Sequence, residues 1–394
     1  MGQTEKPGFT RALRVRFTLA YAALFLPFAV ATPYLQVLLR RRGFERQAIG
    51  LILGTLEVVA VLAPPVWGWL SDRADRRRLF LALGVAGCIP TFLLFGVVQT
   101  LWPALLVAVL FGWCYRPLIP LTDGITFRHI GVCGGDYGSV RIGGSIAFIA
   151  CTITLERLGV AQSQGGTMIL AAMCVACALQ LACVWLLPVV HAARAVPAGH
   201  AGTEKRTMRV FLRRDFLLFT FCAFLGRLAM MGYYGFFSLY LKEVHGFEQA
   251  GLIWWIGPLS EMPVIYFSRR IMQRIGVRNL FALGLAGCTV RLLGFAAAPG
   301  LWCVIPLQLL HSLTFGAYHC ASVTYVSRVV PPRLHSTAQT LFAAITVGGG
   351  GILGGLFGGR IAQAYGFPAM YAVCGATAFA GLLLLLFAVP RRSA

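Results

Sequence analysis

Seven ionisable side chains lie inside long apolar stretches of the sequence, where no bulk water solvates a charge. They are Glu57, Arg116, Arg227, Glu261, Arg291, His311 and His319. Charged groups in such surroundings are costly, and they usually face a cavity or a partner. A carboxyl group there can take up and release a proton, and an arginine can bind a carboxylate through two N–H groups. The pattern therefore predicts binding and proton exchange.

Each of these residues has a candidate role. The carboxyl group of Glu261 is the first candidate for a proton site, followed by Glu57 and then His319. His311 and His319 are eight residues apart, so they lie on roughly one face of a helix. The candidates for substrate binding are Arg291, Arg227, Arg116, His311, Tyr115 and Tyr234. The alternatives are structural ion pairs for the glutamates, packing for the histidines and snorkelling of Arg116 to the membrane surface.

The composition indicates which elements position these side chains. The chain has 394 residues, of which 58% are hydrophobic and 12% are charged, whereas a soluble domain carries about 25% charged residues. Backbone polar groups must be satisfied inside a bilayer, so the apolar stretches must be helices. We expect an all-α polytopic membrane protein with twelve spans, at 15–39, 47–70, 79–98, 101–122, 139–158, 166–190, 213–241, 249–268, 278–297, 301–326, 337–359 and 367–389.

The distribution of Lys and Arg predicts the orientation in the membrane. The termini and every second loop hold 24 of them, and the opposite loops hold 7. Cytoplasmic loops carry the excess, so we expect a multi-pass plasma-membrane protein with both termini cytoplasmic. The stretch RRRGFER at 40–46 departs from this trend. The net charge of +21 then reflects orientation, and we expect no nucleic-acid partner. Neither a cofactor nor a metal is expected, because the twelve cysteines are scattered.

The sequence contains an internal repeat with an offset of about 200 residues. ALGVAGC at 82–88 matches ALGLAGC at 282–288, and GFERQAIGLILGTLE at 43–57 corresponds to GFEQAGLIWWIGPLSE at 246–261. The repeat makes Glu57 and Glu261 counterparts. We expect an N-terminal six-helix bundle (1–190), a cytoplasmic linker (191–212) and a C-terminal six-helix bundle (213–394). Because six is even, both bundles insert in the same orientation, related by an axis along the membrane normal.

The stretch GWLSDRADRRR at 68–78 resembles the cytoplasmic loop motif of the major facilitator superfamily, although Asp75 replaces the usual glycine. The resemblance implies the major facilitator fold, with a loop that latches the two halves in one conformation. Asp72, Arg73 and Arg76 are the corresponding gate residues. We add Asp136 and Arg141 to this gate, because they can pair at the cytoplasmic end of span five.

A narrower resemblance covers almost the whole chain. PLTDG at 120–124, DYGSVRIGGS at 136–145 and LQLLHSLTFGAYH at 307–319 are similar to the 3-phenylpropionate:proton symporter branch, which is related to lactose and nucleoside proton symporters. The resemblance implies that Glu261, Arg291 and a histidine of span ten take part in coupling and binding. Ser322 stands where sugar symporters carry an acid, so the proton site must lie elsewhere.

Together these features predict a monomeric secondary transporter that takes up a small organic solute with protons by alternating access. Away from the ends of the spans, three arginines stand against two glutamates, which favours an organic anion such as an aromatic carboxylate. The alternatives are a proton-coupled sugar or nucleoside symporter and a drug or metabolite:proton exporter. An exporter usually shows a G-P-x-x-G-G motif in span five, which here reads GGSIAFI. A membrane enzyme is disfavoured, because the sequence has no H-E-x-x-H or G-x-S-x-G motif.

Overall fold

The computed structural model describes residues 9–133, 137–188, 209–331 and 334–389. Every regular element in these ranges is a helix. The helices form two compact units, one of residues 1–43 and 62–195, the other of residues 44–61 and 196–394. The helix α2 (Arg46–Arg73) contributes to both units.

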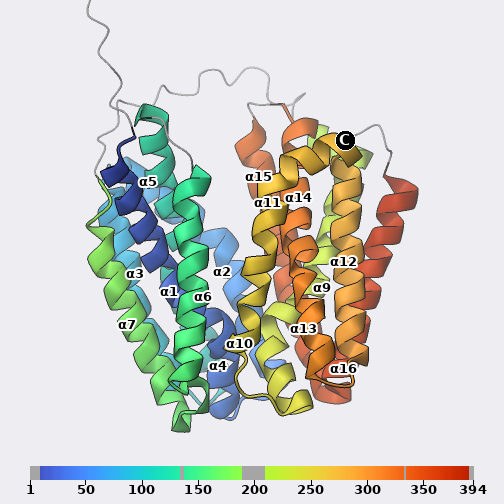
Figure 1. Ribbon diagram of the computed structural model, residues 1–394, viewed down its shortest axis with the longest axis horizontal. Coiled ribbons are helices and arrows are strands. Elements are labelled where there is room, and N and C mark those ends of the chain that lie inside the picture. The colour runs from blue at the N-terminus through green and yellow to red at the C-terminus, as the bar shows by residue number, and fades with distance from the viewer. Residues whose placement is uncertain (1–8, 134–136, 189–208, 332–333, 390–394) are drawn as a thin grey trace, which may run out of the picture. The chain divides into compact units, whose positions relative to one another are not determined.

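The first unit contains six further helices besides the end of α2 (Figure 1). They are α1 (Arg11–Arg41), α3 (Arg77–Leu93), α4 (Leu101–Tyr115), α5 (Leu118–Cys133), α6 (Tyr137–Arg157) and α7 (Thr167–Val184), with short turns η1 (Leu94–Gly96), η2 (Val160–Gln162) and η3 (Gln164–Gly166). Within this unit α1 packs against α6 and α7, and α3 packs against α4 and α7.

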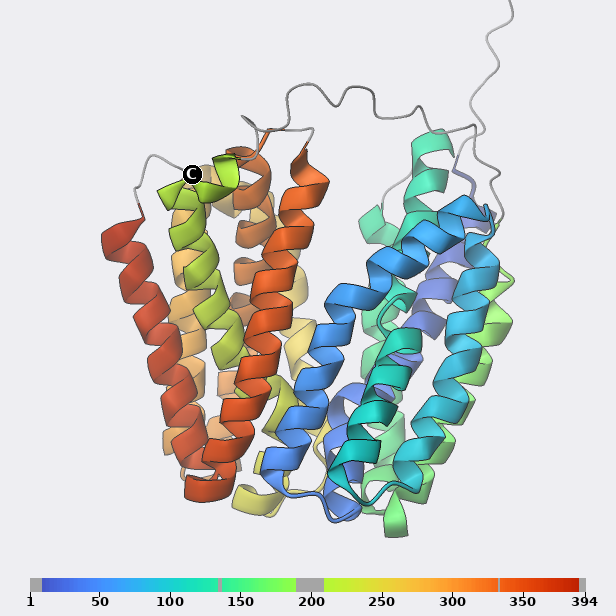
Figure 2. The ribbon, with the colours of Figure 1, turned by 180° about the vertical axis from the view of Figure 1, so that it is seen from behind.

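The second unit is built around α9 (Arg214–His245), which packs along α16 (Gly350–Ala388), while α16 also packs against α12 (Val277–Ala297). A positive φ of 83° at Gly366 turns α16 back on itself, and Figure 2 shows its two arms joined at one end. The remaining elements are η4 (Arg209–Leu212), α10 (Gly251–Trp254), α11 (Ile256–Ile275), α13 (Leu301–Leu309), η5 (Ser312–Ala317), α14 (Tyr318–Val329), α15 (His335–Ala343) and η7 (Ala344–Gly349).

Ten helices among the described residues are long and apolar enough to cross a membrane. One of them, 337–388, joins the expected eleventh and twelfth spans across the bend at Gly366. The expected eighth span, 249–268, corresponds to α10 and α11, which are not among the ten. The predicted spans therefore correspond to helices throughout the described chain.

Glycines bring the first part of α2 into direct backbone contact with α16 inside the second unit. A Cβ atom added at Gly50 would lie 2.1 Å from the carbonyl oxygen of Gly355, and one added at Gly359 would lie 2.6 Å from that of Arg46. No larger residue fits there without a shift of the backbone. This packing groups 44–61 with the second unit, while the boundaries at 190 and 212 remain a prediction.

The basic stretch at 40–46 has structural partners that explain its unexpected position. The guanidinium of Arg41 donates to the carbonyl oxygens of Ala161 and Ser163. Arg46 donates to the carbonyl oxygen of Ala362 at 2.7 Å and pairs with Glu243 at 2.5 Å. These arginines satisfy carbonyl groups at helix ends and loops, a role independent of the rule that relates charge to orientation.

Candidate functional site

The guanidinium of Arg291 on α12 is the centre of a buried polar network in the second unit. Its side chain is among the largest that are fully buried. One terminal nitrogen, Nη1, donates to Nδ1 of His311 at 2.9 Å and to Oγ1 of Thr314 at 3.0 Å. The other, Nη2, donates to Oε1 of Gln308. The guanidinium also lies over the ring of Tyr233, 3.9 Å from its centroid.

The contact with Arg291 determines the protonation state of His311. A guanidinium has only donors, so Nδ1 of His311 must accept, and the ring is neutral with its proton on Nε2. Nε2 faces Oε2 of Glu261 at 3.5 Å. His311 thus lies between Glu261 and Arg291, and the interaction of Glu261 with Arg291 runs through the imidazole ring.

A π-helical turn and the residues just before it present three of these side chains to Arg291. The turn η5 begins directly after His311 and contains Thr314, and Gln308 lies in the last turn of α13. Gln308 is oriented by two further bonds, because its Nε2 donates to the hydroxyl of Tyr233 and to the carbonyl oxygen of Ile253, both at 3.2 Å. Such π-turns inside helices are frequent at functional sites.

A second ion pair lies in the same unit. Nη2 of Arg227 on α9 is 3.6 Å from Oε2 of Glu57 on α2. The guanidinium of Arg227 lies 5.3 Å from the ring centroid of Tyr234, whose ring meets that of His311 edge-on at 6.2 Å. Tyr234 therefore connects the pair Arg227–Glu57 to the network of Arg291. The structure thus brings both candidate glutamates and two candidate arginines into one unit.

The remaining candidates are His319 in the second unit and Tyr115 and Arg116 in the first. The ring of Phe315 stacks between those of His311 and His319 at 5.8 and 5.4 Å, but His319 is exposed and has no hydrogen bond or ion pair with a described residue. Tyr115 and Arg116 belong to the first unit. There Tyr115 stacks on Phe28 at 4.3 Å, and Arg116 caps the end of α4 with its guanidinium 5.9 Å from the Tyr115 ring.

The first unit holds two partly or fully buried carboxyl groups that sequence reasoning missed. Asp123 accepts from the hydroxyls of Tyr21 at 2.5 Å and Tyr137 at 3.0 Å. Glu156 accepts from the hydroxyl of Tyr34 at 2.8 Å. Asp123 lies in the PLTDG string, one residue beyond the expected end of span four at 122. It therefore did not count as a charged residue inside a span, although a span end two residues later would have included it.

One of the residues assigned to the gate, Asp72, forms ion pairs within the first unit. Asp72 pairs with Arg77, and Oδ1 of Asp72 and of Asp75 each lie 3.5 Å from Arg128 on α5. Asp75, which stands where the motif has glycine, adopts a positive φ of 49° between α2 and α3. The aspartate thus keeps the left-handed turn, which short polar residues tolerate better than others.

The remaining gate residues have different surroundings. Arg73 lies over the ring of Trp69 at 5.4 Å, and Arg76 precedes the first turn of α3. Arg141 lies over the ring of Phe25 at 4.1 Å. Asp136 is outside the described residues, so its expected pairing with Arg141 remains a prediction.

The fold and its buried charges can be compared with known proteins. The pattern of the MFS_1 like family matches residues 15–373. The chain belongs to this family. It is therefore a multi-pass membrane transporter of the major facilitator superfamily and not an enzyme.

Three comparisons illustrate the breadth of this family. The transporter is 27% identical to a maltose permease of Geobacillus stearothermophilus, over 99% of this chain and 98% of the relative. It is 26% identical to a probable 3-phenylpropionic acid transporter of Escherichia coli (strain K12), over 88% and 91%. The crystal structure of the nucleoside transporter NupG superposes with a TM-score of 0.82 at 17% identity, covering 96% of this chain and 98% of that one. The last likeness supports the all-α major facilitator fold.

Proposed function

We propose that this transporter takes up a small organic anion, an aromatic carboxylate first of all, together with protons by alternating access. The observation that carries the proposal is a donor of Arg291 that has no partner among the described residues. Its Nε is buried and forms no hydrogen bond with a described residue. A buried donor left unsatisfied costs about 1–3 kcal/mol. A substrate carboxylate oxygen would satisfy it, and arginine is suited to carboxylates by geometry and charge.

The charges of the network link this anion to a proton. Arg227 and Arg291 balance Glu57 and Glu261 when both carboxyl groups are ionised. Protonation of Glu261 leaves one positive charge in excess, which favours an anion. His311 cannot take this proton while its Nδ1 accepts from Arg291. We therefore assign the coupling proton to Glu261, with Glu57 as the second candidate. Binding of the proton then raises the affinity for the substrate anion, and binding of the anion raises the affinity for the proton.

The expected outcome of an uptake assay with the full-length transporter in vesicles follows from this assignment. Labelled 3-phenylpropionate should accumulate when the outside is acidic, and a protonophore should abolish accumulation. Labelled maltose and uridine serve as the comparison, because the relatives named above include a maltose permease and a nucleoside transporter. Proton-driven uptake of maltose or uridine, without uptake of the acid, would contradict the substrate class and retain the symport mechanism. Efflux of the substrate driven by an acidic outside pH would favour an exporter.

The proposed orientation places both termini in the cytoplasm. It rests on the excess of Lys and Arg in the loops on the side of the termini. A reporter fused behind the last residue should be cytoplasmic. A reporter inserted beside Glu243, near the C-terminal end of α9, should be external. The opposite pattern would overturn the orientation and, with it, the cytoplasmic position of the loop at 68–78.

A further inference from the structure

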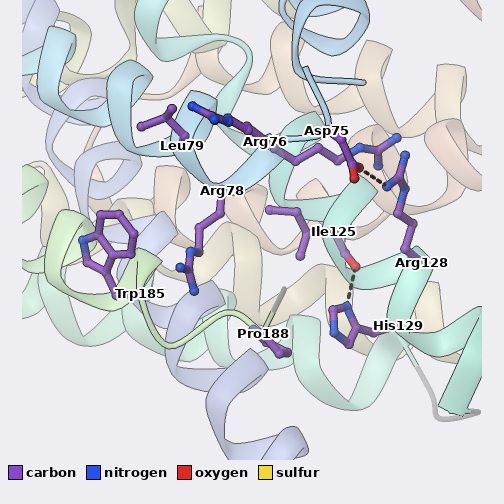
Figure 3. A pocket seen from close by; sticks show the side chains of 10 residues that line it. Asp75, Arg76, Arg78, Leu79, Ile125, Arg128, His129, Trp185 and Pro188 are labelled. Carbon is purple, nitrogen blue, oxygen red and sulfur yellow. Dashed lines mark hydrogen bonds and ion pairs between the residues drawn. The ribbon is translucent and has the colours of Figure 1, made fainter. Parts of the chain in front are cut away.

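A basic cavity in the first unit lies outside the network described above. It opens between the start of α3, the second half of α5 and the end of α7 (Figure 3). Its charged and aromatic lining comprises Arg76, Arg77, Arg78, Arg128, His129 and Trp185. The start of α3 and the second half of α5 thus contribute the cationic side chains of this cavity, together with a single acidic lining residue, Asp75.

Two of the four arginines in this cavity have no acidic partner among the described residues. Arg77 pairs with Asp72, and Arg128 lies 3.5 Å from both Asp72 and Asp75. Arg76 and Arg78 form no ion pair with any residue in the described part of the chain. Four guanidiniums facing two carboxylates leave an excess of two positive charges. The cavity therefore selects an anion, and arginine prefers phosphate or carboxylate oxygens.

The surroundings of Arg78 indicate where this anion comes from. Its guanidinium donates to the carbonyl oxygen of Leu187 at 3.2 Å. It also lies 4.7 Å from the ring centroid of Trp185, and Figure 3 shows both side chains. Trp185 follows the last turn of a candidate membrane span and is 55% exposed. Tryptophans at such positions mark the membrane–water interface. The arginine is thus held at the level of lipid headgroups.

Exposed apolar side chains lie next to the cavity. Leu79 and Leu83 on α3 are 39% and 52% exposed, and Leu186 beside Trp185 is 36% exposed. In a membrane protein such side chains contact acyl chains. A basic cavity with an adjoining apolar surface matches a molecule that has a phosphate group and hydrocarbon tails. A soluble anion would use the arginines but would leave the apolar side chains without a role.

We propose that this cavity binds the phosphate headgroup of an anionic glycerophospholipid. Arg76 and Arg78 contact the phosphate, Trp185 marks the depth of the headgroup, and Leu79 and Leu83 contact the chains. Arg77 and Arg128 shape the site through their pairs with Asp72 and Asp75. Basic pockets between helices at a membrane surface recognise such headgroups.

The test uses the full-length transporter purified in neutral detergent, with lipid binding followed by native mass spectrometry. The probes are phosphatidylglycerol, phosphatidylcholine and glycerol 3-phosphate. Each guanidinium removed should weaken binding of phosphatidylglycerol about fivefold, so the double variant Arg76→Gln/Arg78→Gln should bind it roughly 25-fold more weakly. The single variant Arg76→Gln, at an exposed position before α3, tests the site with little risk to folding.

The matched control is the double variant Arg269→Gln/Arg274→Gln. It removes the same charge from exposed positions at the end of α11, in the counterpart of this loop in the sequence repeat. The control should bind phosphatidylglycerol like the wild type. Equal losses in both double variants would overturn the proposal in favour of diffuse attraction. Equally tight binding of phosphatidylcholine, or full competition by equimolar glycerol 3-phosphate, would also overturn it, the latter in favour of a soluble anion.

Discussion

Glu261→Gln is expected to abolish proton-driven accumulation and to leave exchange of labelled for unlabelled substrate intact. The glutamine keeps the size of the side chain and an oxygen that accepts from Nε2 of His311, which lies 3.5 Å from Glu261 in the wild type. It cannot release a proton, so it fixes the site in its neutral form. Substrate then crosses in both directions without a link to the proton gradient. Uptake and counterflow in vesicles measure the two activities separately.

The pH dependence of binding gives an independent measure of the same change. If the anion binds when Glu261 is protonated, affinity falls as pH rises, by at most about tenfold per pH unit for one linked proton. The Gln variant should bind with the affinity of the protonated wild type and show no such fall. Accumulation at the wild-type level in Glu261→Gln would show that another group couples, and the test would then move to Glu57.

A control separates this effect from a general loss of charge. Glu248 also carries a carboxylate in the second unit, but it is exposed and pairs with Lys242 at 2.7 Å outside the network. Glu248→Gln should therefore retain accumulation and its pH dependence. If both variants lost accumulation equally, the result would indicate damage to folding or insertion and would contradict a specific role for Glu261.

Much of the helical framework is predictable from the sequence, because hydrophobicity and charge define membrane spans directly. The expected span 278–297 corresponds to α12 at Val277–Ala297, and 213–241 to α9 at Arg214–His245. The prediction was less accurate where a helix changes its internal geometry. Span four was expected to end at 122, whereas the chain breaks at Arg116 and continues in α5 to Cys133. Pro117, which lacks a backbone N–H, was the available signal.

The charged members of the site were predictable, and the uncharged ones were not. Glu261, Arg291 and His311 stand out because charges are rare in apolar helices, and the structure joins them in one network. Gln308 and Thr314 are ordinary polar residues, and their contacts with Arg291 depend on how the helix is rotated around the π-turn η5. Periodicity of 3.6 residues per turn does not reveal such a turn, so these partners required the structure.

Arg291→Lys is expected to weaken substrate binding by about tenfold or more, since hydrogen bonds to charged groups contribute about 1.5–3 kcal/mol each. Lysine keeps the charge but loses the planar fork and the stacking on Tyr233. It also frees Nδ1 of His311, which then becomes available for a proton. The variant should therefore show an altered pH profile of binding as well as a lower affinity, both measurable with labelled substrate.

The matched control is Arg278→Lys on the same helix. Arg278 is also buried, and its guanidinium donates to the backbone carbonyl oxygens of Leu385, Leu386 and Val389 at 2.8–3.0 Å. Its replacement should lower the melting temperature and leave substrate affinity and pH profile unchanged. If Arg291→Lys behaved in the same way, with reduced stability and wild-type affinity, Arg291 would be a structural residue. The proposed anion would then have to bind Arg227, which already lies close to Glu57, so that substrate and Glu57 would compete for one guanidinium.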